Sequence, residues 1–138
     1  MLIADKDKSG PLLRHLCSVN NMCFPAEERP SQGMFEYEAE TGFLFVTPDK
    51  WGLAIVKQQN GAHLWTLAVH PDMRRLGHGQ SLLMEVNDLF RDITLHTRVD
   101  NVPAQLLYLK NGYRVEKVLK GYYPNKIDGL LMRRNYAY

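Results

Sequence analysis

Apolar residues in the first forty positions recur at the three- to four-residue spacing of helices. One stripe predicts a helix from about residue 9 to about residue 22, and it consists of Leu12, Leu13, Leu16, Cys17 and Val19. A second, shorter helix is expected after Pro30-Ser31, where Met34, Phe35 and Tyr37 follow. Residues 2–4 are apolar and predict a short first strand.

Three strand-like segments follow, at residues 42–46, 51–57 and 63–69. Asn60-Gly61 separates the second from the third and is typical of a tight hairpin. Pro71 ends the third segment.

The second half of the chain alternates between the two periodicities. Helices are predicted at 79–90 and 103–110, and strands at 93–98, 114–120 and 129–134. Asn111-Gly112 is typical of the left-handed cap that ends a helix. This order predicts an α/β (α+β) fold with a mixed, mostly antiparallel central sheet of six to seven strands and helices on both faces.

Composition limits the possible partners. The 138 residues contain no repeat or linker and are expected to form one domain, 1–138. Seventeen basic and fifteen acidic residues give a net charge of +2 without a basic block, so no nucleic-acid partner is expected. No apolar run is long enough for a membrane span and no leader is evident, which predicts a cytoplasmic protein without a membrane partner. Cys17 and Cys23 lack zinc spacing, so no metal is expected.

A glycine-containing turn follows the strand at 63–69. Arg74 and Arg75 precede Gly77 and Gly79, where the next helix begins. Such a turn points backbone N–H groups outwards at the positive end of the helix dipole, which suits a phosphate. No Gly-Lys-Ser/Thr follows, which excludes a P-loop, and Leu82 stands in place of the third glycine of the dinucleotide fingerprint.

A second motif lies downstream and reads Asn101-x-x-Ala104-x-x-Leu107-Tyr108-x-x-x-Gly112-Tyr113. Helical spacing places Ala104, Leu107 and Tyr108 on one face, so core packing alone would explain them.

Together, the two motifs resemble those of the Gcn5-related N-acetyltransferase (GNAT) family. The pyrophosphate loop of that family reads Arg/Gln-x-x-Gly-x-Gly/Ala, and this chain has Arg74-x-x-Gly77-x-Gly79. The resemblance covers about residues 51–134. It implies the GNAT fold, in which the sheet splays between the fourth and fifth strands, and acetyl-CoA as cosubstrate without a metal.

The resemblance also implies where acetyl-CoA binds. Loop N–H groups would hold the pyrophosphate, the preceding strand would pair with the pantetheine arm, and Asn101 and Tyr108 would lie near the arm and the thioester sulfur. The implied cofactor-binding residues are Leu67, Ala68, Val69, Arg74, Arg75, Leu76, Gly77, His78, Gly79, Gln80, Asn101 and Tyr108.

Acetyl transfer by direct attack in a ternary complex needs a deprotonated primary amine, a stabilised oxyanion and a departing thiolate. Tyr108 is the candidate to protonate or hydrogen-bond the thiolate. His96 and His63 are the leading candidate bases, because they fall on the strands that frame the expected cleft and histidine titrates near the working pH. His63 is expected on the same side of its strand as Trp65 and Leu67.

The other candidate bases are His70, His78, Glu85 and Asp100. His70 and His78 flank the glycine turn and are expected to meet phosphate or solvent instead. A strand N–H near residues 67–69 could stabilise the oxyanion.

A closer resemblance concerns the acceptor. Residues 95–101 and the Tyr122-Tyr123 pair resemble the protein N-terminal and ribosomal-protein acetyltransferases, which implies a protein or peptide N-terminus as acceptor. Phe24, Tyr122 and Tyr123 are then the substrate-binding residues. Two alternatives stay open: a small-molecule amine such as a polyamine, amino acid or antibiotic, and a non-catalytic CoA-binding regulatory module. Both a monomer and a homodimer are compatible with the sequence.

Overall fold

The computed structural model describes residues 1–135. Six strands form one sheet in the order β1-β2-β3-β4-β6-β5, in which β3 and β4 are parallel and the other neighbours are antiparallel. The strands are β1 (Phe43–Val46), β2 (Gly52–Gln58), β3 (Ala62–Val69), β4 (Asp92–Arg98), β5 (Arg114–Tyr123) and β6 (Ile127–Asn135).

Four α-helices flank the sheet: α1 (Gly10–Asn21), α2 (Gln32–Thr41), α3 (His78–Leu89) and α4 (Val102–Lys110). Three of them begin at a side-chain cap, because Ser9, Ser31 and Asn101 each accept a hydrogen bond from a backbone N–H of the first turn. Short 3-10 turns occur at Asp5–Asp7, Ala26–Glu28, Pro71–Met73 and Pro124–Lys126. No helix within residues 1–135 is long and apolar enough to cross a membrane.

Each face of the sheet carries its own hydrophobic core. Leu16 of α1 and Phe35 of α2 are fully buried against Leu53 and Ile55 of β2 on one face. The core on this face is the α1/α2 core. On the other face, Leu83 and Val86 of α3 and Tyr108 of α4 pack against the sheet in the α3/α4 core, which also contains Val56, Ile93 and Leu95. The mixed sheet with helices on both faces confirms the predicted fold.

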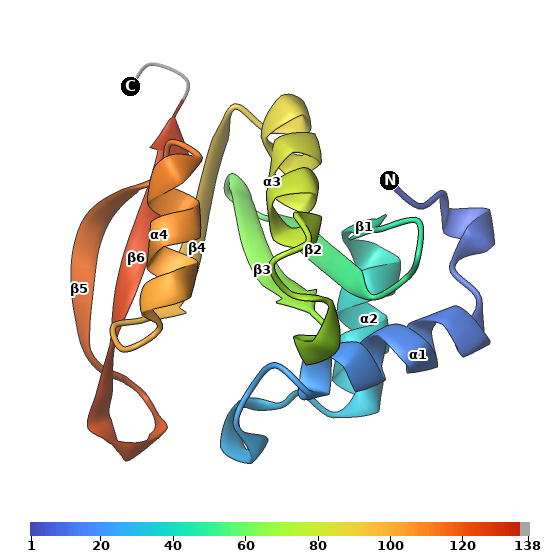
Figure 1. Cartoon of the computed structure of the whole chain (residues 1–138), viewed down its shortest axis with the longest axis horizontal. Helices are drawn as coiled ribbons and strands as arrows, with labels where there is room; N and C mark the ends of the chain where they lie inside the picture. The colour runs from blue at the N-terminus through green and yellow to red at the C-terminus, as the bar shows by residue number, and fades with distance from the viewer. Residues whose placement is uncertain (136–138) are drawn as a thin grey trace.

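The two parallel strands separate soon after they meet. Residues 62–64 of β3 pair with residues 93–95 of β4, and the strands then diverge, as Figure 1 shows for β3 in green and β4 in gold. The pairing of β3 with β2 also shifts, because Ile55 lies opposite Thr66 while Val56 lies opposite Leu64. Trp65 is therefore the extra residue of a β-bulge just where the strands part.

Two sequence predictions need correction. Residues 2–4 do not form a strand, since Leu2 makes only an isolated bridge to Phe45 of the four-residue strand β1. The expected splay between the strands at 63–69 and 93–98 is confirmed, but these are the third and fourth strands and not the fourth and fifth, because residues 2–4 are not a strand. In addition, β5 continues through Tyr123 rather than ending near residue 120, because Tyr123 pairs with Ile127 of β6.

Candidate active site

Two histidines meet at the point where β3 and β4 begin to part. Ile93 and Leu95 are buried in the α3/α4 core, so the alternation of β4 turns Thr94 and His96 to the opposite face of the sheet. His63 emerges on that same face, and its ring centroid lies 4.7 Å from that of His96.

The expected tyrosine pair lies beside these histidines. The Tyr122 hydroxyl is 3.2 Å from Nδ1 of His96, and the two ring centroids are 4.8 Å apart. Tyr123 follows in an edge-to-face contact with Tyr122, at 5.0 Å between centroids. His63, His96, Tyr122 and Tyr123 therefore form a row of aromatic side chains, contributed by β3, β4 and β5.

Burial keeps both imidazoles neutral near neutral pH. It lowers the pKa of His63 to about 4, with a further contribution from the neighbouring His96. Burial also lowers the pKa of His96 below its ordinary value of 6.5. A neutral imidazole retains a lone pair and can accept a proton or a hydrogen bond.

Tyr108 does not share this face. It projects from α4 into the core that contains Ile93 and Leu95, where its ring lies 5.7 Å from that of Tyr113. Burial raises the pKa of Tyr108, and the Tyr123 phenol raises it further. The structure thus places Tyr108 and the two histidines on opposite faces of the sheet.

An ion-pair network spans the open end of the split. Arg98 on β4 donates to Glu28 in the loop between α1 and α2 at 2.5 Å, and holds Asp100 with two further bonds. Burial raises the pKa of Tyr123 to about 12. The charge of Glu28 also raises this pKa, whereas the charge of Arg98 lowers it. Phe24, in the same loop, is half-buried against the α1/α2 core, and its carbonyl accepts a bond from Arg29.

The glycine turn has a backbone shape that suits an anion. Arg75 and Gly77 both adopt left-handed conformations, with φ of 66° and 87°. A Cβ on Gly77 would meet no atom within 4 Å, whereas one on Gly79 would lie 3.2 Å from Leu107 of α4. Gly77 therefore borders open space at the helix end, while Gly79 allows α3 and α4 to pack closely.

The first turn of α3 leaves its N–H groups directed towards that open space. The first helical bond of α3 runs from the Ser81 N–H to the Gly77 carbonyl, so the preceding N–H groups have no acceptor within the helix. Arg74, Arg75 and Leu76 are exposed beside them. This arrangement fits a phosphate group.

Two side chains of the turn serve the protein itself. The His78 imidazole lies 2.6 Å from Asp49 instead of facing solvent, and this bond lowers the pKa of Asp49 to about 2. Gln80 exchanges two amide hydrogen bonds with Asn111, each of 2.8 Å, which tie α3 to the end of α4. Any anion contact by these two residues would come from their backbone N–H groups.

The strand expected to pair with an extended ligand has a free edge. Beyond Leu64, no residue of β3 pairs with β4, so its backbone groups on that side face the split. Because the bulge at Trp65 reverses the alternation, Leu67 packs against the α3/α4 core and Ala68 against the α1/α2 core. The expectation that Leu67 shares a side with His63 and Trp65 is therefore wrong.

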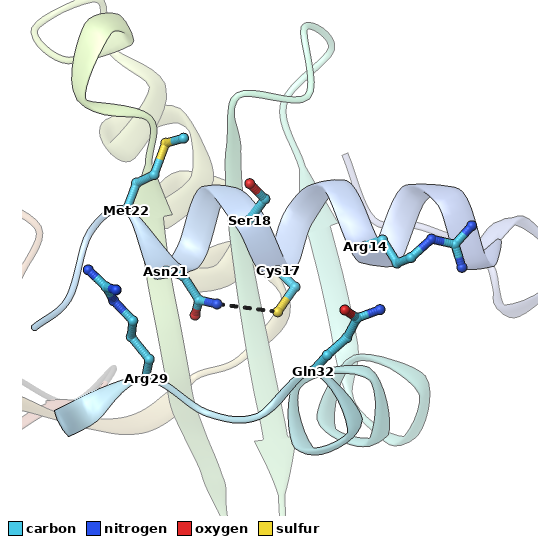
Figure 2. Close-up of a pocket in the computed structure, with 7 residues that line it drawn as sticks. All are labelled: Arg14, Cys17, Ser18, Asn21, Met22, Arg29 and Gln32. Carbon is cyan, nitrogen blue, oxygen red and sulfur yellow. Dashed lines mark hydrogen bonds between the residues drawn. The ribbon is translucent and has the colours of Figure 1, made fainter. Parts of the chain in front are cut away.

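Two hollows lie on the α1/α2 side of the sheet. One, of about 270 Å³, borders His63 and is lined by Glu38, Lys57, Gln59, His63 and Trp65. The other, of about 430 Å³, lies over α1 and contains none of the expected site residues (Figure 2). Its lining residues are Arg14, Cys17, Ser18, Asn21, Met22, Arg29 and Gln32, and Figure 2 shows the Arg14 guanidinium directed away from the others.

Sequence reasoning did not identify several residues that hold this region together. Glu28, Arg98 and Thr94 each bond across elements that are distant in sequence, and Asp49 bonds to His78. No local motif marks Glu28, Thr94 or Asp49, and Arg98 lies in the 95–101 segment without a predicted role of its own. Within residues 1–135, no group of three His, Cys, Asp or Glu side chains could hold a metal ion.

The split mixed sheet with helices on both faces has the architecture of solved GNAT acetyltransferases. The sequence agrees, since the model of the acetyltransferase (GNAT) family matches residues 13–113. This chain therefore belongs to the GNAT family.

Several curated relatives with similar sequences come from archaea. An N-alpha-acetyltransferase of Saccharolobus solfataricus is 36% identical over 95 residues, which is 62% of this chain and 57% of that protein. The chain thus spans just over half of the length of this relative. An N-alpha-acetyltransferase of Sulfolobus acidocaldarius is 33% identical over 137 residues, covering 83% of this chain and 81% of the relative.

Solved structures share the fold. The ribosomal-protein-S18-alanine N-acetyltransferase of Escherichia coli superimposes with a TM-score of 0.79 at 22% identity, covering 97% of this chain and 90% of that one. A NatC complex bound to Gag peptide and CoA gives a TM-score of 0.80 at 18% identity, covering 98% of this chain and 96% of that one.

Proposed function

We propose that this protein transfers the acetyl group of acetyl-CoA to the free α-amine of a protein or peptide. The observation that carries the proposal is the pair of neutral histidines, flanked by Tyr122 and Tyr123, at the split between β3 and β4. The archaeal relatives named N-alpha-acetyltransferase support the choice of acceptor.

Acetyl-CoA would lie on the α3 side of the split and supply an activated thioester. The N–H groups at the start of α3, with Arg74 and Arg75 nearby, suit its pyrophosphate. The edge of β3 at Leu67, Ala68 and Val69 pairs with no strand on the side of the split and suits the amide groups of the pantetheine arm. The Val69 carbonyl on this edge already accepts bonds from Cys23 and Arg74. Asn101 caps α4 through its side chain, so its contribution would be to fix the helix that carries Tyr108.

The acceptor would enter from the face that carries the histidines. His96 accepts the amine proton, with His63 beside it or through a water molecule, and the neutral amine then attacks the thioester carbonyl. Burial lowers both pKa values, so both imidazoles are unprotonated near neutral pH and can accept a proton or a hydrogen bond. The same burial weakens them as bases, and His63, with a pKa of about 4, is better suited to accepting a hydrogen bond than to holding the proton. A backbone N–H of the free β3 edge stabilises the oxyanion.

The acceptor class can be tested by measuring thiol release from acetyl-CoA with matched peptides. One peptide without lysine carries a free α-amine, and its control is identical but blocked at the N-terminus. Turnover is expected with the free peptide alone, and mass spectrometry should place one acetyl group on its α-amine.

A panel of polyamines, amino acids and antibiotic amines completes this experiment. Turnover on these amines but not on the peptides would overturn the peptide assignment. If no amine supports turnover while CoA still raises the melting temperature, the chain is a CoA-binding module and not an enzyme.

A further inference from the structure

Thr94 contacts His63 across the short parallel pairing of β3 with β4. The two residues are register partners, and Oγ1 of Thr94 lies 2.7 Å from Nδ1 of His63. The same hydroxyl lies 3.5 Å from the Ala62 carbonyl oxygen, to which it donates a long hydrogen bond. The imidazole of His63 is thus tied at Nδ1, and Nε2 lies on the far side of the ring.

The count of protons at this hydroxyl selects one arrangement. A threonine hydroxyl has a single proton to donate but can accept as well. If that proton went to His63, the hydroxyl and the Ala62 carbonyl would face each other as two acceptors. Both contacts are hydrogen bonds only when the hydroxyl donates to Ala62 and accepts from an Nδ1–H of His63.

We propose that Thr94 is a positioning residue that holds neutral His63 as the tautomer with its proton on Nδ1. Nε2 then carries the lone pair and serves as the hydrogen-bond acceptor for the incoming amine or its ordering water. This role for Nε2 rests on the proposed acetyl transfer, whereas the tautomer itself does not.

The surroundings of His63 allow Nε2 to work in this way. The ring of His96 lies 4.7 Å away on one side, and the hollow of about 270 Å³ borders His63 and can admit water. His96 has its own partner at Nδ1, the Tyr122 hydroxyl, so each histidine is tied at Nδ1 by a hydroxyl from another strand. These two hydrogen bonds orient both imidazole rings before the amine substrate binds.

Nitrogen-15 NMR of histidine side chains tests the tautomer directly, with the His63 signals assigned by their loss in His63→Gln. In the unliganded protein near neutral pH, Nδ1 of His63 should give the shift of a protonated ring nitrogen and Nε2 that of an unprotonated one. Thr94→Val keeps the shape of the side chain but removes the hydroxyl, so the proton should move to Nε2. Thr94→Ser retains the hydroxyl and should retain the wild-type signals.

Kinetics then link the tautomer to turnover. Thr94→Val should lower kcat about 2- to 10-fold, as expected for one neutral hydrogen bond, with Thr94→Ser near wild type and the KM for acetyl-CoA unchanged. A protonated Nε2 on His63 of the wild-type protein would overturn the proposal, and this measurement stands even if Thr94→Val does not fold. Unchanged signals in a folded Thr94→Val would overturn it as well. If no amine is acetylated at all, the proposed function fails while the tautomer remains measurable.

Discussion

The environment of Tyr108 limits how its phenol can assist a departing thiolate. Burial raises its pKa above the ordinary value of 10.0, whereas an unperturbed thiol has a pKa of about 8.5. Complete proton transfer from the phenol to a thiolate is therefore uphill. Under the proposed function, Tyr108 would stabilise the thiolate by donating a hydrogen bond, and the proton would come from solvent afterwards.

Tyr108→Phe should consequently lower kcat by roughly ten- to a hundredfold, the effect of losing one hydrogen bond to a charged group. The phenylalanine ring still fills the core, so the affinity for CoA should change little. Steady-state kinetics and calorimetric titration with CoA measure the two effects separately.

Tyr113→Phe is the matched control for this substitution. Tyr113 is also buried in the α3/α4 core, but its hydroxyl donates to Asn87 at 2.9 Å. Loss of this hydrogen bond in Tyr113→Phe should reduce the free energy of unfolding by about 1 kcal/mol and leave kcat near the wild-type value. A Tyr108→Phe protein with wild-type kcat would show that the phenol plays no part in the chemistry.

At the junction of β3 and α3, the capacity to bind an anion depends on the shape of the backbone more than on the side chains. Gly77 caps α3 in a left-handed conformation with φ of 87°, and that geometry directs the first N–H groups of the helix towards open space. Side chains nearby are largely engaged elsewhere, since His78 bonds to Asp49 and Gln80 to Asn111. The helix end itself is thus the main candidate for pyrophosphate binding.

Gly77→Val should abolish the rise in melting temperature that CoA produces in the wild-type protein. A β-branched side chain strains the left-handed backbone and occupies the space in front of the helix end. Differential scanning fluorimetry with and without CoA provides the measurement.

Gly61→Val separates strain from obstruction. Gly61 also has a positive φ, 104°, and open space around it, but it lies in the hairpin between β2 and β3. Both variants should lose roughly 1–2 kcal/mol of stability, and only Gly61→Val should keep the CoA-dependent rise. A full rise in Gly77→Val would refute the assignment of the pyrophosphate to this turn.

The stability of the whole molecule should carry a signature of its buried histidines. The folded chain holds the pKa of His63 at about 4, below the ordinary 6.5, and also lowers that of His96. Between pH 4 and pH 6.5 the unfolded chain therefore binds more protons than the folded chain. The free energy of unfolding consequently rises with pH up to about 6.5, and it falls as the pH drops below 6.5. The lowered carboxyl pKa values of Asp49 and Asp92 act in a different window, below their ordinary 3.8.

His63→Gln should therefore flatten the decline of the melting temperature between about pH 6.5 and pH 4. Asp92→Asn is the contrasting variant, because it should alter the profile only below about pH 4. Thermal unfolding across this range measures both. A slope in His63→Gln equal to that of the wild type would mean that His63 is as accessible to protons in the folded chain as in the unfolded one.

Local sequence determined most of the elements. The apolar stripe of α1 and the caps at Ser9 and Ser31 are local signals, and the structure contains both helices. Asn60 and Gly61 likewise form the expected turn, with positive φ at both residues. The two glycine-containing motifs indicated the family and the split sheet, because they depend on spacing within a single segment.

The tertiary structure decided which residues face one another. The bulge at Trp65 turns Leu67 to the face opposite His63, an outcome that strict alternation along the strand cannot predict. The sequence names His63, His96 and Tyr108 as candidates but does not show that a sheet separates the phenol from the imidazoles. The bonds from Thr94 to His63 and from Arg98 to Glu28 join residues 31 and 70 positions apart, so they exist only once the chain has folded.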